Sequence, residues 1–283
     1  MNTVEMFIWN QYRKDGVGMH SFTDKVDGQQ YLYTQFEADF CHYVFPCFDQ
    51  PDLKAHWTLT AMAEEDWTVF SNEYPENEVA KEREDVFTNT MSDVTTVFSG
   101  NSTRIEKPKS YFFARSDYIA PYVYAIVAGA FGYYSKEAEG CPPLRIYARK
   151  SVMESVNHEE MFKVTIAGMR FYKDFFGVAY PFNKYCQVFV PEHNYGAMEN
   201  VGCVTYNEAY LYRNEVPTLA KRLRFSITNL HELAHMWFGN LVTMKWWNDL
   251  WLNESFATFM SFLAMSNSEE LSYFNTCWVT FLQ

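Results

Sequence analysis

The chain has 283 residues, of which 48% are hydrophobic and 19% aromatic, so it is long enough to bury a large core and to form about two domains. Asp and Glu number 35 against 23 Lys and Arg, which gives a formal net charge of -12. This balance argues against nucleic acid or an anionic membrane as the main partner. No apolar run reaches the length of about 18 residues that a membrane-spanning helix needs, so no membrane segment is expected.

Residues 1–149 are expected to form a β-rich domain. Short segments rich in Val, Thr, Tyr and Phe recur between turn residues, a pattern typical of strands. The expected strands are Val4–Trp9, Tyr31–Phe36, Trp57–Ala61, Trp67–Ser71, Asp93–Phe98, Tyr122–Ala128 and Leu144–Ala148.

Residues 150–283 change to the helical spacing of apolar residues. The pattern predicts helices over 161–177, 219–239 and 249–265, with Gly177 and Gly239 as natural stops. Between the first two helices, 185–190 is expected to be a strand. The layout is therefore a β-rich domain over 1–149 followed by an α-rich domain over 150–283.

The six cysteines and the first residues suggest a compartment. The cysteines are scattered without a C-x-x-C pair, which is more typical of reduced thiols in the cytosol than of a disulfide scaffold. The first ten residues lack the basic start and apolar stretch of a signal peptide. We therefore expect a cytoplasmic protein.

The letters H-E-L-A-H at residues 231–235 match the H-E-x-x-H pattern. On a helix, residues four apart differ by about 40° in azimuth and about 6 Å in rise, so His231 and His235 can bind one cation. Glu232 lies beside that cation, which suits a base acting on a water molecule that the metal activates. The pattern alone is not decisive, because two histidines on a helix face with a solvated glutamate would look the same.

A third candidate ligand, Glu254, follows His235 after 18 intervening residues. A hairpin of two helices can bring this carboxylate to the imidazoles, although an acid near the start of a helix is also favoured by the helix dipole. Two His and one Glu leave a position open for water, as in catalytic zinc sites. We expect one Zn2+ per chain, although cobalt or manganese could occupy the site. With Glu232 as base, this chemistry predicts hydrolysis of an amide or ester.

Together, several motifs resemble the M1 family of gluzincin aminopeptidases. They are Y-T-Q-F-E at 33–37, F-P-C-F-D-Q-P at 45–51, G-A-M-E-N at 196–200, H-E-L-A-H-M-W-F-G-N at 231–240 and N-E-S-F-A at 253–257. The resemblance runs from about Gly16 to Met265. It implies an α+β fold, with a saddle-like β-rich domain followed by the first part of a thermolysin-like, mainly α catalytic domain.

Carried over by position, the resemblance implies that His231, His235 and Glu254 ligate zinc and that Glu232 is the general base. The complete enzyme would remove single residues from peptides. Family members also have a longer N-terminal domain, a tyrosine that stabilises the oxyanion and a helical domain that closes the site, and none of these is found here. We therefore expect a fragment, and its last apolar stripe, 271–281, stops without a cap.

The resemblance also implies a site for a peptide with a free N-terminus. Glu199 would bind the α-amino group, helped by Gln35 and Glu37. An α-amine has a pKa of about 7.7–8.0, so it is largely protonated at neutral pH and is attracted to carboxylates. The small residues of G-A-M-E-N would let the substrate pair with the backbone like an added strand. The expected substrate-binding residues of this motif are Gly196, Ala197, Met198, Glu199 and Asn200.

Three alternatives remain beside this hypothesis. The chain could be a truncated, catalytically weak or dead product that still binds zinc and peptide. A related hydrolase acting on a lipid epoxide is disfavoured, because that branch carries a second glycine where this sequence has Ala197. An endopeptidase would cleave N-acetylated peptides, which is inconsistent with an amine-binding role for Glu199.

Overall fold

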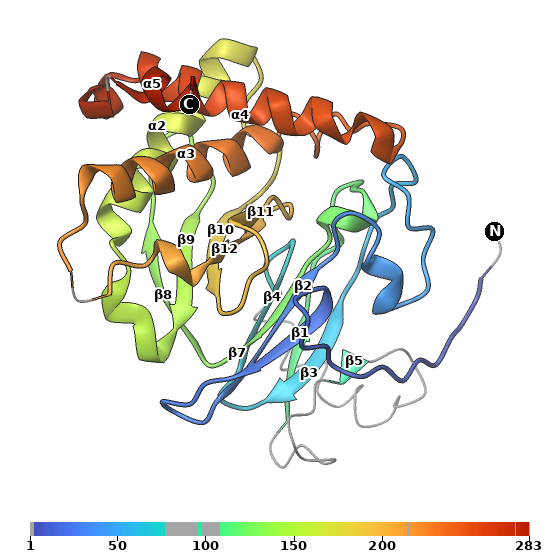
Figure 1. Cartoon of the computed structure of the whole chain (residues 1–283). Helices are drawn as coiled ribbons and strands as arrows, with labels where there is room; N and C mark the ends of the chain where they lie inside the picture. Colours follow the sequence, from blue (N-terminus) through green and yellow to red (C-terminus); the bar gives the residue numbers. More distant parts are fainter. Residues whose placement is uncertain (1–2, 77–95, 98–107, 214, 275, 283) are drawn as a thin grey trace.

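Sheets and a group of helices form the part of the chain that the computed structural model describes, residues 3–76, 96–97, 108–213, 215–274 and 276–282 (Figure 1). One antiparallel sheet has four strands in the order β1 (Gly18–Thr23), β2 (Gln30–Gln35), β7 (Ile126–Gly129) and β4 (Thr68–Ser71). A smaller sheet has the order β5 (Thr96–Val97), β3 (Thr60–Glu64) and β6 (Pro108–Phe112). The β-rich first half of the predicted α+β fold is therefore confirmed.

A mixed sheet of five strands lies between the antiparallel sheet and the helices. Its order is β11 (Ala197–Met198), β12 (Cys203–Asn207), β10 (Tyr185–Val190), β9 (Leu144–Arg149) and β8 (Phe131–Lys136). The three inner strands are parallel, and every residue of β10 is buried, as expected for a sheet covered on both faces. Because β8 and β9 precede residue 150, we propose that the domain boundary lies near Ala130 instead of 149.

Side chains on opposite faces of a strand enter different cores. On β2, Tyr31 and Tyr33 pack toward the five-stranded sheet, where they join Val188 of β10 in one buried cluster. Leu32, which points the other way, joins the cluster between the two N-terminal sheets. A third cluster fills the space between the five-stranded sheet and the helices. The β2 strand is therefore fixed from both sides, and it leads directly into the segment that carries Glu37.

The helices gather at one end of the molecule (Figure 1). They are α2 (His158–Phe176), α3 (Leu219–His235), α4 (Leu250–Asn267) and α5 (Cys277–Phe281). Short 3-10 helices span Cys41–Tyr43, Pro121–Val123, Lys150–Ser155, Glu208–Tyr210, Trp247–Asp249 and Glu269–Phe274. As predicted, α2 ends at Gly177, whose φ of 68° is the left-handed conformation that glycine adopts freely. Within α2, a Cβ added to Gly168 would lie 2.4 Å from Leu230 Cδ2, so α2 and α3 approach closely at this glycine.

The helix α3 is shorter than its apolar stripe predicts. The Oγ1 atom of Thr218 accepts from the Lys221 N–H and caps the start of the helix. The helix ends at His235 and not near Gly239, because the chain turns back and the Phe238 carbonyl accepts a hydrogen bond from His235 Nδ1. In the described residues, no helix is long and apolar enough to span a membrane.

The strand predictions succeed in part. The structure confirms, to within one residue at each end, Tyr31–Phe36, Trp67–Ser71, Leu144–Ala148 and 185–190. The expected strand Trp57–Ala61 begins only at Thr60, and Tyr122–Ala128 begins at Ile126 because Pro121 starts a 3-10 helix. Of Asp93–Phe98, only Thr96 and Val97 lie within the described residues, and they form β5.

The expected strand Val4–Trp9 is wrong. These residues have no regular secondary structure, and the side chains of Phe7 and Trp9 are 83% and 91% exposed. Aromatic and β-branched residues favour a strand only where a neighbouring strand pairs with them. None of the described strands pairs with this segment.

Candidate metal centre and active site

Three side chains from two neighbouring helices converge at one point. His231 and His235 lie one turn apart on α3, and Glu254 faces them from α4. The two Nε2 atoms are 2.9 Å apart, and Glu254 carboxylate oxygens lie 3.2 Å from Nε2 of His231 and 3.5 Å from Nε2 of His235. Two ligand atoms of a tetrahedral zinc ion, each about 2.0–2.1 Å from the metal, are about 3.3 Å apart. The three side chains therefore fit a zinc ion.

The other nitrogen of each imidazole is held by a hydrogen bond. His235 Nδ1 donates to the Phe238 carbonyl at 3.0 Å, and His231 Nδ1 contacts Thr258 Oγ1 at 3.2 Å. These contacts turn both Nε2 atoms toward Glu254, which is the orientation that metal-binding histidines need. The sequence analysis missed Thr258, although it lies four residues after Glu254 and therefore on the same face of α4.

We expect Thr258→Val to weaken zinc binding by about 10–100-fold, because such outer partners hold a ligand ring in place. The measurement is zinc affinity by competition with a chelator of known affinity. The exposed Thr280→Val in α5 removes the same hydroxyl elsewhere and serves as the matched control. Equal zinc affinity in the two variants would contradict the role given to Thr258.

A buried polar network fixes the helix that carries both histidines. Asn229 of α3 donates to Gln187 Oε1 at 2.7 Å and contacts Thr165 of α2 at 3.1 Å, and Gln187 in turn donates to Thr165 Oγ1 at 3.0 Å. All three side chains are fully buried. The Tyr172 hydroxyl also donates to the Leu230 carbonyl at 2.8 Å. Because these groups satisfy one another in the core, α3 has one defined position against α2 and the sheet.

Carboxylates crowd around the candidate metal centre. Oxygen atoms of Glu37, Glu199 and Glu254 lie within 4.8 Å of one another. Burial, followed by the charge of Glu254, raises the pKa of Glu199 to about 8. Burial and the charges of Glu199 and Glu254 raise the pKa of Glu37 well above its usual value. Burial, followed by the charges of Glu199 and Glu254, also raises the pKa of Glu232.

Within the described part of the chain, two oxygens of this group, Glu199 Oε1 and Glu232 Oε2, are buried and have no hydrogen-bond partner. The carboxylates border a cavity of about 290 Å³. The lining residues are Glu37, Tyr195, Gly196, Ala197, Glu199, Tyr210, Ile227, Thr228, His231, Glu232 and Glu254. Among these described lining residues there is no lysine or arginine. Buried like charges are costly unless a cation compensates them, so the cavity fits a ligand that brings positive charge.

The structure brings most of the predicted substrate-binding residues to this cavity. Gly196, Ala197 and Glu199 line it, and Ala197 lies in β11, which is at the edge of its sheet. An edge strand has unpaired backbone groups that can bind an extended peptide. A Cβ added to Gly196 would lie 2.9 Å from the Tyr210 hydroxyl, so a larger residue at this position would displace that hydroxyl. Tyr210 was not predicted, and its own sequence context gives no signal.

Three predicted residues lie away from the cavity. Gln35 is fully buried, and its Nε2 contacts Met198 Sδ at 3.3 Å. Met198 is also buried. Asn200 is buried, and its Nδ2 donates to Thr205 Oγ1 at 3.4 Å. These side chains support the segment that carries Glu199, whereas Glu37 reaches the cavity itself.

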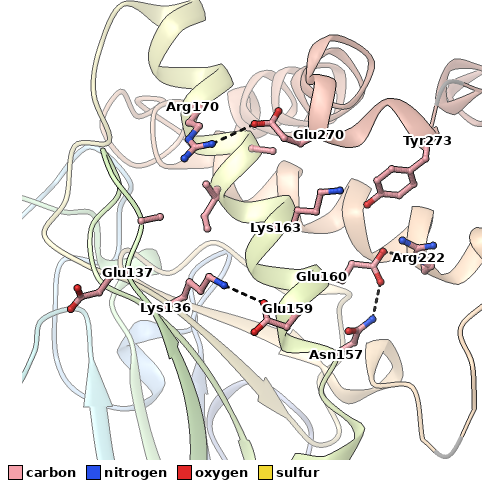
Figure 2. A pocket seen from close by; sticks show the side chains of 13 residues that line it. Lys136, Glu137, Asn157, Glu159, Glu160, Lys163, Arg170, Arg222, Glu270 and Tyr273 are labelled. Carbon is pink, nitrogen blue, oxygen red and sulfur yellow. Dashed lines mark hydrogen bonds and ion pairs between the residues drawn. The ribbon is translucent and has the colours of Figure 1, made fainter.

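A larger cavity of about 750 Å³ lies between α2 and the chain that follows α4 (Figure 2). Its charges are largely paired with one another, since Arg170 lies 3.4 Å from Glu270 and Lys136 lies 3.1 Å from Glu159. Arg222 also pairs with Glu160. None of the predicted site residues lines this cavity, so size alone does not identify the candidate site.

Comparison with protein families matches residues 3–96 to the Peptidase M1 N-terminal domain and residues 160–282 to the Peptidase family M1 domain. Similar curated proteins include aminopeptidase N of Streptomyces lividans, 43% identical over 88% of this chain and 26% of the relative. Puromycin-sensitive aminopeptidase of Caenorhabditis elegans is 34% identical over 86% of this chain and 23% of its own length. Aminopeptidase N of Homo sapiens is 34% identical over 83% of this chain and 22% of its own length. The chain thus spans about a quarter of the length of these curated relatives.

Proposed function

The chain belongs to peptidase family M1, and from this premise we propose that it carries the zinc centre and the amine-binding carboxylates of an aminopeptidase. One observation carries the proposal. His231 and Glu254, which converge with His235, border the same cavity as Glu232, Glu199 and Glu37. The zinc site, with one ion per chain, and the site for a cationic group on the substrate are therefore adjacent.

In this proposal His231, His235 and Glu254 hold the zinc ion, which supplies a Lewis acid that polarises the scissile carbonyl and lowers the pKa of water. Glu232 is the general base. Its carboxylate takes a proton from the attacking water and passes it to the leaving amine. Glu232 is buried, and one of its oxygens has no hydrogen-bond partner among the described residues. Both properties suit a carboxylate that must take up and release a proton during the reaction.

Glu199 and Glu37 select the substrate. A protonated α-amine compensates the charge of these buried carboxylates, whereas an acetylated one brings no charge and adds bulk. Because Glu199 stays at a fixed place relative to the zinc ligands, one residue fits between the amine and the scissile carbonyl. We therefore propose that peptides with a free N-terminus are the substrates and that single N-terminal residues are released.

The test uses aminoacyl arylamides, each supplied free and N-acetylated, with the zinc-loaded chain and with Glu199→Gln. We expect turnover of free substrates only, and a higher KM for them in the variant because an attractive charge is lost. Cleavage of acetylated substrates would contradict the amine-binding role. Bound zinc and peptide without turnover would instead support a chain that binds substrate and does not catalyse.

A further inference from the structure

A second group of metal-binding side chains lies outside the candidate active site. The sulfurs of Cys41 and Cys47 and a carboxylate oxygen of Asp49 all lie within 4.8 Å of one another. Cys41 is in the short 3-10 helix that follows β2, and it is fully buried. Cys47 is partly buried and lies in the irregular segment that follows this 3-10 helix. Both cysteines are free thiols.

The Asp49 carboxylate is buried with one oxygen unsatisfied. Its side chain is only 8% exposed. The Oδ2 atom accepts the His42 backbone N–H at 2.9 Å and lies 2.8 Å from His42 Nδ1. The Oδ1 atom is buried and has no hydrogen-bond partner among the residues that the structure describes. A buried acceptor without a partner is destabilising, and more so if it is charged, so this oxygen is suited to a ligand.

We propose that Cys41, Cys47 and Asp49 bind one divalent zinc-like cation, at a site separate from the candidate catalytic centre. Two thiolates and a carboxylate are a donor set that selects zinc or a softer ion over magnesium or calcium. Sulfur ligands of tetrahedral zinc, each about 2.3 Å from the metal, are about 3.8 Å apart. The three ligand atoms of this cluster lie within 4.8 Å of one another, which is compatible with that separation. His42 holds the carboxylate from outside, as the outer partner of a ligand does.

The position of this site gives the ion a structural role. Glu37 and Cys41 lie in the same segment, which is folded back by the Phe40 N–H donating to the Phe36 carbonyl at 2.9 Å. Phe36 also packs edge-on against Phe45, with ring centroids 5.9 Å apart. An ion held by Cys41 and Cys47 therefore closes the loop that contains Phe45 and fixes the segment that leads from Glu37.

Cadmium titration of the full chain tests the proposal, because cadmium bound to thiolate gives a sulfur-to-metal charge-transfer absorption. The ligands of the candidate catalytic centre contain no sulfur, so they do not contribute to this absorption. We expect saturation at one thiolate-bound cadmium per chain and loss of the absorption in Cys47→Ser. Asp49→Asn, which keeps the shape of the side chain, should weaken the affinity by about tenfold or more, since even outer-partner changes cost about 10–100-fold.

Cys141→Ser is the matched control, because Cys141 is also a partly buried free thiol and lies outside the cluster. This variant should keep the absorption and the affinity, and circular dichroism checks that each variant is folded. Three results would overturn the proposal. They are the absence of the absorption in the unchanged chain, its persistence in Cys47→Ser, and a Cys41–Cys47 disulfide in the protein as isolated.

Discussion

Glu232→Gln is expected to lower kcat for free aminoacyl substrates by about 10²–10⁴ and to leave the zinc content unchanged, because it removes a general base and no ligand. In the structure Glu232 is buried beside His231 in the cavity, and it is not among the three side chains that converge as ligands. Glutamine has the same shape and cannot take a proton from water. The measurement is steady-state hydrolysis of an arylamide, with zinc determined on the same samples.

The control for this variant is Glu159→Gln on α2. The Glu159 side chain is 70% exposed and pairs only with Lys136 and His158 among the charged groups in the described chain, so its replacement should leave kcat and zinc content as they are. A Glu232→Gln enzyme with unchanged kcat would refute the general-base role. Loss of zinc in that variant would show that the residue acts through the metal centre instead.

Arg149→Met is expected to lower the free energy of unfolding by about 3–5 kcal/mol, because it removes the buried partner of two buried carboxylates and leaves Glu208 only the exposed Arg213 as an ion-pair partner in the described chain. Arg149, at the end of β9, donates to both oxygens of Glu208 and also to Asp24, and all three residues are buried. Asp24 follows β1, so the cluster joins the antiparallel sheet to the five-stranded sheet. Urea denaturation measures the effect.

Lys136→Met provides the comparison, because the Lys136–Glu159 pair is exposed on both sides and such pairs contribute about 0–1 kcal/mol. A loss in Arg149→Met no larger than in Lys136→Met would contradict the importance of the buried cluster. Both variants replace a paired cation by Met, but Arg149 bonds two carboxylates and Lys136 only one, so the difference between them measures burial together with the larger number of bonds.

The same cluster gives stability a defined pH dependence. Burial opposes ionisation of Asp24, but hydrogen bonds from Ser151 and the Val26 N–H, together with Arg149, lower its pKa in the folded state. A lowered pKa stabilises the fold above the unfolded value of about 3.9, and this contribution is lost as the pH falls through the folded pKa. In Arg149→Met the acid side of the stability profile should therefore be flatter.

Local patterns predicted much of the helical half. The spacing of His231 and His235 and the start of the next helix at Glu254 were readable because these residues are close in the sequence. The strands β1, β6, β8, β11 and β12 were missed. The residues of β12 are mostly buried on both faces, so the strand lacks the alternation that marks a half-exposed strand.

Contacts between remote segments could not be predicted. The resemblance gave Gln35 and Glu37 the same role beside Glu199, but only the packing of Gln35 against Met198 shows that Gln35 supports the segment that carries Glu199. Likewise, the scattered cysteines gave no metal-binding pattern in the sequence, and only the fold brings Cys41 and Asp49 to Cys47. Tertiary structure, and not local preference, decides such positions.

Some residues of the site are close to one another in the sequence and others are far apart. This difference affects the order in which the site assembles during folding. The two histidines and Glu254 belong to one helical hairpin, whose closure is a local event. Glu37 must arrive from the opposite half of the chain, and Glu199 from the sheet between them. Because loop closure costs more entropy for distant segments, the hairpin with the proposed zinc ligands can form before the carboxylates proposed to bind the amine are in place. A folding intermediate with that hairpin would bind zinc before it could distinguish one peptide terminus from another.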